Sequence, residues 1–148
     1  MAEGFLSISV KGLTPALLHN QTWMTVSLEQ QVGMALEDSL IRLENTAALT
    51  AHGLFKNPTG ALNSHFGGQI TSWGFPVISG MVFNDSPYAW RRDRGFSGMT
   101  DSLGRFYPND PGVYYMENAL TTETDWIAAR FKKAVRLALN EFSAGGTP

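Results

Sequence analysis

The stretch Asn57-Pro58-Thr59-Gly60-Ala61-Leu62 divides the chain into two parts with different periodicity. Before it runs a long helical pattern, and after it come short strand patterns that are rich in glycine and aromatic residues. Proline and glycine are the strongest local signals of a turn. The stretch therefore marks a change from helix to strand, and the elements on either side of it decide the fold.

The helical pattern before this turn runs from about Ser27 to His52. Ser27 and Gln30 have the spacing of a capping box, and Gly53 fits the left-handed residue that commonly follows a helix. We therefore expect the helix to begin at Ser27 and to end before Gly53. Its apolar residues recur at the spacing of one buried helix face: Leu28, Val32, Ala35, Leu36, Leu40, Leu43 and Ala47.

A second helical pattern closes the chain, from about Thr122 to Phe142. Thr122 and Asp125 form a capping pattern at its start. Acidic residues come early in this helix and basic residues late, which matches the helix dipole. Its main apolar stripe consists of Ile127, Phe131, Ala134, Val135, Ala138 and Phe142.

Two apolar residues of this last helix lie off its main stripe. Trp126 and Leu137 are eleven residues apart, so they share a second face, which Arg130 and Lys133 border. Isolated exposed apolar residues are normal on a monomer, whereas interfaces between proteins prefer Trp and Arg. Both interpretations stay open, and the second predicts a contact face for a neighbouring subunit.

Three stretches have strand patterns. Leu6, Ile8 and Val10 alternate with polar residues, as in a half-buried strand. Gln69–Phe75 and Val77–Phe83 form two further strands on either side of Phe75-Pro76, where proline is expected at an edge or a turn.

No period is visible between Arg91 and Gly112, although Tyr88-Ala89-Trp90 has the pattern of a short helical turn. A loop of this length inside a compact domain is usually functional or disordered. The segment is too apolar for pure disorder, and we expect it to become ordered against a neighbouring subunit. Its apolar residues are Phe96, Met99, Leu103, Phe106 and Tyr107.

The densest charge cluster is Arg91-Arg92-Asp93-Arg94. It fits either a solvated loop edge with one local ion pair or a contact with an acidic protein or with DNA phosphates. The net charge of the whole chain is −2, which favours the protein contact over DNA.

These patterns together predict one domain, residues 1–148, because the length is typical of a single domain. We expect an α+β fold in which a small, mainly antiparallel β-sheet packs against two long α-helices. A long loop is left for contacts between subunits.

The sequence shows no constellation of residues for catalysis, metal binding or cofactor binding. His19, His52 and His65 lack the spacing of a helical zinc pair. Gly95-Phe96-Ser97-Gly98-Met99 lacks the final glycine of a nucleophile elbow, and the chain has no cysteine. We therefore expect no catalytic residue, no metal site and no cofactor.

The order of the pieces along the chain resembles the tail-completion (neck, head–tail joining) family of long-tailed double-stranded-DNA bacteriophages, from about Ile8 to Phe142. Members typically open with a strand that ends in glycine, as in Ile8–Leu13. A long helix and a Pro-x-Thr-Gly-x-Leu-like turn follow. Pro58, Thr59, Gly60 and Leu62 match that turn with one residue fewer between Pro and Thr.

Two later segments extend the resemblance. Tyr88 and Ala89, followed by Asp93 and Gly95, have the spacing of the family's Tyr-Ala…Glu-x-Gly motif, with Asp in place of Glu. Tyr114–Leu120 stands where the family has a Pro-Phe-Leu-x-Pro-Ala-Leu-like start of the last helix, and it lacks both prolines. Each motif is weak alone, and the specificity lies in their order and spacing.

The resemblance implies a structural virion protein of the phage neck, assembled in the host cytoplasm. Such proteins form a ring, expected here to be a hexamer, between the head-closure or connector protein and the tail tube or tail terminator protein. Double-stranded DNA passes through the ring without sequence-specific binding, and no membrane partner is expected. Tail completion, tail termination and head closure stay open as the station of this chain.

The expected subunit or partner contacts come from the loop and from the second face of the last helix. They are Arg91, Arg92, Arg94, Phe96, Met99, Phe106, Tyr107, Trp126, Arg130, Lys133 and Leu137.

Two other classes of function stay open. A small hydrolase-like enzyme would use the aromatic middle of the chain as a pocket, and a cleft that joins a histidine to Asp85 or Asp93 would favour it. A monomeric adaptor or binding module would remain a monomer at high concentration.

Overall fold

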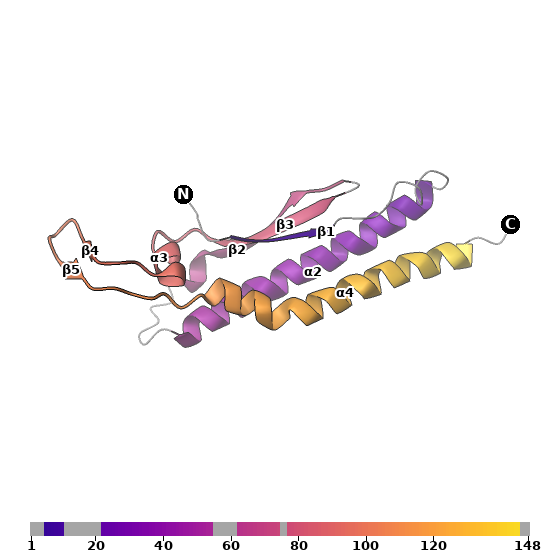
Figure 1. The fold of residues 1–148 in the computed structure, drawn as a ribbon. Coiled ribbons are helices and arrows are strands. Elements are labelled where there is room, and N and C mark those ends of the chain that lie inside the picture. The colour runs from indigo at the N-terminus through magenta and orange to yellow at the C-terminus, as the bar shows by residue number, and fades with distance from the viewer. Residues whose placement is uncertain (1–4, 11–21, 55–61, 75–76, 146–148) are drawn as a thin grey trace. The chain divides into compact units, whose positions relative to one another are not determined.

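The computed structural model describes residues 5–10, 22–54, 62–74 and 77–145. In this part the chain is mixed α/β, with three helices, a small antiparallel sheet and a long helix that packs on the strands (Figure 1). The elements follow one another as β1 (Phe5–Val10), α2 (Thr22–Leu54), a 3-10 turn (Asn63–His65), β2 (Phe66–Ser72), β3 (Ile78–Asn84), α3 (Ala89–Arg94), β4 (Met99–Thr100), β5 (Phe106–Tyr107) and α4 (Tyr115–Gly145).

The strands form two sheets. β3 lies between β1 and β2 in the three-stranded sheet, and β4 and β5 form a separate two-stranded sheet. The predicted strand near the N-terminus is confirmed by β1, and β2 and β3 confirm the two strands expected around Phe75-Pro76. β2 begins three residues before the predicted start at Gln69.

α2 is longer than predicted at both ends. Ser27 and Gly53 lie inside it, so the predicted cap at Ser27 and the predicted end before Gly53 are wrong. The Ser27 hydroxyl donates to the Glu141 carboxylate of α4, and the Gln31 amide donates to the same carboxylate at 3.1 Å. The Ser27 side chain, which the sequence spacing predicts to be a helix cap, therefore bonds to another helix instead. The predicted buried face is confirmed, from Leu28 to Ala47.

Two glycines let α2 pack on β3 and on Trp73, the residue that follows β2. A Cβ at Gly33 would overlap the Trp73 ring, and a Cβ at Gly80 would lie 2.7 Å from Leu40 Cδ1. Gly80 belongs to the buried side of β3, which alternates buried and half-buried residues along its length. The absence of a side chain at Gly33 and Gly80 therefore lets the helix and the strands approach closely.

α4 begins seven residues before the predicted start at Thr122. The Thr122 hydroxyl donates to the Asn118 carbonyl at 2.8 Å, a bond made inside a helix, so the predicted cap is wrong. Of the predicted apolar stripe, Ile127, Ala134 and Ala138 are buried. Phe131 and Val135 are half-buried, and the side chain of Phe142 lies outside the described residues.

Contacts along the backbone divide the chain into two compact units, each made of three segments. The first unit comprises Met1–Leu6, Leu43–Gly67 and Val82–Thr122. The second comprises Ser7–Arg42, Gly68–Met81 and Glu123–Pro148. The single domain expected from the chain length stays a prediction. The turn residues Pro58, Thr59 and Gly60 lie outside the described residues.

Candidate interface: the hairpin arm and its support

The segment expected to be an aperiodic loop is partly ordered by hydrogen bonds of its own. Its first residues, Arg91–Arg94, belong to α3. The hairpin arm, which we define as Phe96–Asp110, follows and extends beyond α3 (Figure 1). Phe96 and Asp110 exchange two backbone hydrogen bonds at its base, of 2.8 and 2.9 Å. Met99 pairs with Tyr107 further along. The prediction of an aperiodic loop is therefore wrong. The sequence showed no period because each of the paired strands, β4 and β5, has only two residues.

The tip of the arm is organised by Asp101. Its carboxylate accepts backbone N–H bonds from Leu103 and Arg105, both at 2.9 Å, and a guanidinium bond from Arg105 at 2.7 Å. The Tyr107 hydroxyl donates to it at 3.2 Å. The backbone bond from Arg105, together with the other bonds, lowers the pKa of Asp101. The tip therefore holds a defined turn around a charged carboxylate at neutral pH.

The arm exposes large apolar side chains. Leu103 is 75% exposed and Phe106 is 70% exposed, and Tyr107 is partly exposed beside them. Single exposed apolar residues are normal on a protein surface. Here they are gathered on one short hairpin whose turn is fixed, an arrangement typical of a contact surface.

Asp93 supports the base of the arm. The residue is 1% exposed, and its carboxylate accepts the Met116 backbone N–H at 3.1 Å, at the start of α4. Its own carbonyl accepts the backbone N–H of Tyr114 at 2.8 Å. Burial raises the pKa of Asp93, while the bond from Met116 and the charge of Arg94 oppose that shift. Asp93 therefore joins the end of α3 to the start of α4.

Two glycines let the two ends of the arm approach each other. Gly95 and Gly112 have positive φ, +80° and +77°. A Cβ at Gly95 would overlap the Asp110 carbonyl oxygen, and a Cβ at Gly112 would overlap backbone atoms of Arg94 and Gly95. Only glycine fits both the backbone conformation and the contact at these positions.

Tyr115 completes the support of the arm. Its hydroxyl donates to the Ala89 carbonyl at 3.2 Å, and its ring meets Phe66 edge-on, with 5.7 Å between centroids. Tyr115 and Ala89 are both buried, and burial raises the pKa of Tyr115 above its ordinary range. Of the sequence motif, Ala89, Asp93 and Gly95 thus hold the base of the arm, while Tyr88 is exposed.

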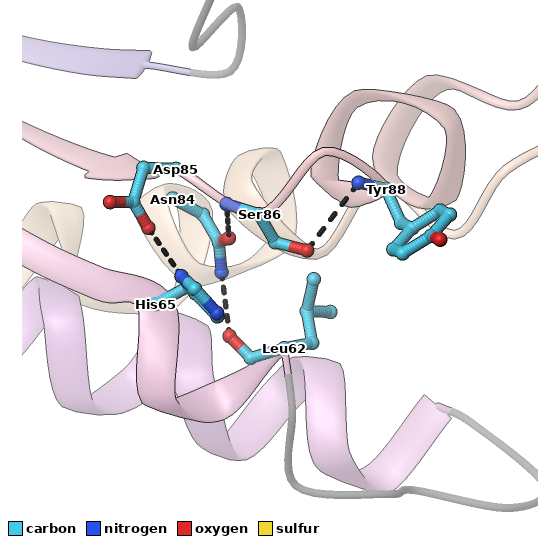
Figure 2. Close-up of polar contacts among 6 residues, drawn as sticks. All are labelled: Leu62, His65, Asn84, Asp85, Ser86 and Tyr88. Atoms are coloured by element: carbon cyan, nitrogen blue, oxygen red, sulfur yellow. Dashed lines mark hydrogen bonds and ion pairs between the residues drawn. The ribbon is translucent and has the colours of Figure 1, made fainter.

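A polar cluster lies where β2 begins and β3 ends (Figure 2). His65 Nδ1 is 2.7 Å from Asp85 Oδ1, and the Asp85 backbone N–H donates to the His65 carbonyl at 3.2 Å. The Asn84 side chain donates to the Leu62 carbonyl at 2.8 Å and accepts the Ser86 backbone N–H at 3.0 Å. The structure thus joins a histidine to Asp85, on the surface, since both side chains are about half exposed.

The arginines of α3 differ in their surroundings. Arg94 lies over the rings of Trp90 and Tyr114, at 5.8 and 5.6 Å from the ring centroids. Arg92 is 3.7 Å from the Asp110 carboxylate at the base of the arm. Arg91 is exposed. Arg92 is therefore paired with the base of the arm, and Arg94 packs on the aromatic rings beside it.

The second face of α4 faces its own chain in part. The Arg42 guanidinium of α2 lies 4.6 Å from the Trp126 ring centroid and is paired with Glu123. Arg130 forms an ion pair with Asp38 of α2, with 2.7 Å between nitrogen and oxygen. Lys133 and Leu137 are exposed. Trp126 and Arg130 thus have partners within the chain, and the predicted role of this face in subunit contacts stays a prediction.

Asp101 is a residue that sequence reasoning missed. It is absent from the predicted contacts, yet it orders the tip that presents Leu103 and Phe106. The sequence does contain a turn signal at this place, Asp101-Ser102-Leu103-Gly104, in which Asp starts the turn and glycine takes a positive φ.

Other kinds of site were sought in the part of the chain that the structure describes. There, no group of three or more His, Asp or Glu side chains is placed to hold a metal ion. Among the same residues, no helix combines the length and apolarity needed to span a membrane. Comparisons with protein-family models, curated proteins and solved structures find no match to this chain.

Proposed function

We propose that this chain is a structural subunit of the neck of a long-tailed double-stranded-DNA bacteriophage, acting in tail completion or tail termination. Its copies form a ring of six that joins the head-closure or connector protein to the tail tube or tail terminator protein. The observation that carries the proposal is the hairpin arm, which presents Leu103 and Phe106 to solvent from a supported base. A contact between subunits would bury these side chains.

The resemblance and the structure support each other at one point. The spaced residues Ala89, Asp93 and Gly95 carry the resemblance, and they are the residues that hold the base of the arm. A motif whose residues hold an exposed arm in place suits a structural subunit that binds its neighbours through that arm. The proposal includes a sheet that packs against both long helices, α2 and α4. The close contacts of Gly33 and Gly80 support the packing against α2.

The proposal also sets the environment of the protein. It places the subunit in the virion, after assembly in the host cytoplasm, with no membrane partner and no catalytic role. DNA passes through the ring without sequence-specific recognition, and the net charge of −2 favours transit over tight binding, because phosphate contacts depend on Lys and Arg.

The test is the mass of the assembled protein, measured for the wild type, for Phe106→Ser and for Leu139→Ser. Leu139 serves as the control, because it is also a large, exposed apolar residue but lies on α4 and not in the arm. We expect a ring for the wild type and for Leu139→Ser, and a smaller assembly for Phe106→Ser with unchanged helical content. A wild type that stays a monomer at high concentration would favour an adaptor and contradict the proposal.

The pair His65–Asp85 favours a second candidate, a small hydrolase-like enzyme, because a carboxylate oriented towards an imidazole can set up a general base. Hydrolysis of a simple ester by the wild type, lost in His65→Gln at equal stability, would support it. Equal rates for both proteins would remove it.

A further inference from the structure

α2 carries a second apolar stripe that faces away from its buried residues. Every residue of this α2 stripe is exposed. The spacing of four, four, three and four residues places the stripe on one face of the helix. Its members are Val26, Gln30, Met34, Glu37 and Ile41.

The α2 stripe has the character of a contact surface. Val26 and Ile41 are each 59% exposed, and Met34 lies between them. The stripe runs over sixteen residues of helix, from Val26 to Ile41, and its two ends are about 22 Å apart at the helical rise. Solvent-facing helix positions are ordinarily polar. Three large, exposed apolar residues in one row therefore indicate a surface that a partner covers.

The charges of the α2 stripe and of the arm's base are complementary. Glu37 is exposed within the stripe. α2 as a whole contains four carboxylates, of which Asp38 is paired with Arg130: Glu29, Glu37, Asp38 and Glu44. α3, at the base of the arm, has three arginines around the buried Asp93. Arrangements of opposite charge across an interface select the partner and its orientation.

The length of the arm also fits. From Phe96 at the base to Leu103 at the tip the chain advances seven residues, which can span at most about 25 Å when extended. This reach is close to the length of the α2 stripe. The hairpin can therefore lie along the stripe with its tip near one end and α3 near the other.

We propose that the hairpin arm of one copy lies along the α2 stripe of a second copy of this chain, with Leu103 against Val26, Phe106 against Met34 and Arg91 beside Glu37. The inference rests on the proposed ring and names the contact within it. The two surfaces are different, so the contact is heterologous, the kind that closes into rings.

Disulfide cross-linking tests the contact directly, because the chain has no cysteine of its own. Phe106→Cys is mixed with a Met34→Cys protein that carries a mass tag, and the mixture is oxidised gently. A disulfide needs the two Cα atoms within about 7 Å, so we expect a mixed dimer. Leu139→Cys, exposed on α4, replaces Met34→Cys in the control and should give at most a tenth of that yield.

Charge reversal gives an independent measure. Glu37→Arg and Arg91→Glu should each raise the apparent dissociation constant of the assembly roughly tenfold, because each places like charges together. The two changes combined should restore most of the affinity, which general destabilisation would not do.

The outcomes separate this contact from the ring itself. Rings in electron micrographs without the mixed dimer, or with equal yield from the Leu139→Cys control, would overturn the contact and leave the ring standing. A mixed dimer from a protein that forms no ring would support the contact and overturn the ring. A wild type that remains a monomer throughout would overturn both.

Discussion

The carboxylate of Asp93 accepts a hydrogen bond from the backbone N–H of Met116, 23 residues further along the chain, at 3.1 Å. The bond satisfies one of the free N–H groups at the start of α4 and places an acidic group at the positive end of the helix. Since Asp93 also lies in the last turn of α3, one buried side chain fixes both sides of the hairpin arm.

Removing this carboxylate should destabilise the protein. Asp93→Ala leaves the Met116 N–H without its acceptor in a buried place, which costs roughly 1–3 kcal/mol of unfolding free energy. Asp93→Asn keeps an oxygen acceptor and should cost less. Urea unfolding of the two variants and the wild type gives the comparison. An alanine variant as stable as the wild type would contradict the capping role.

The same residue should make stability depend on pH. Burial raises the pKa of Asp93, with Glu117 adding to the shift and Arg94 opposing it. A carboxyl whose pKa is higher in the folded state adds stability below its unfolded pKa of about 3.9, and loses that contribution as pH rises through the folded pKa. The stability of the wild type relative to Asp93→Asn should therefore fall as pH increases across this interval. A constant difference would show that the burial of the charge has no net effect.

Gly95, at the base of the arm, and Gly104, near its tip, should tolerate alanine differently. Gly95 and Gly104 both have positive φ, but a Cβ meets backbone atoms only at Gly95, and nothing lies within 4 Å at Gly104. Gly104→Ala should cost about 1 kcal/mol from backbone strain. Gly95→Ala should cost about 1–3 kcal/mol more, because the ends of the arm must move apart. Thermal unfolding of the two variants tests this order, and equal losses would argue against the close approach at Gly95.

The contact of Gly33 with Trp73 should appear as coupling between the two positions. Gly33→Ala alone places a methyl group in the indole ring and should destabilise the protein by about 1–3 kcal/mol. In a Trp73→Ala background the same change should be neutral or stabilising, because alanine is the better helix former by about 1 kcal/mol. Chemical unfolding of the four proteins gives the coupling energy. Additive effects would place the ring away from Gly33 in solution.

Much of the fold could be predicted from periodicity. The buried face of α2 and the alternation of apolar and polar residues in β1 are local patterns that recur every few residues. The helix ends could not be predicted in this way. Ser27 looked like a cap but bonds to Glu141 of α4, and the acceptor at the start of α4 is Asp93, far away in sequence.

The candidate site could be predicted only in outline. Phe106 and Tyr107 were expected to be contact residues because they are apolar residues in a segment without a period, and both are exposed on the arm. The hairpin itself was missed, because β4 and β5 have two residues each. Gly95 and Asp93 were recognised by their spacing in the sequence. Their structural roles follow only from the contacts of Gly95 with Asp110 and of Asp93 with Met116.

Electron micrographs of the purified wild-type protein test the central claim most directly, since they show the assembly without any substitution. We predict ring-shaped particles with a central hole and six subunits. Uniform small particles without a hole, at concentrations where the solution mass is that of one chain, would contradict the claim.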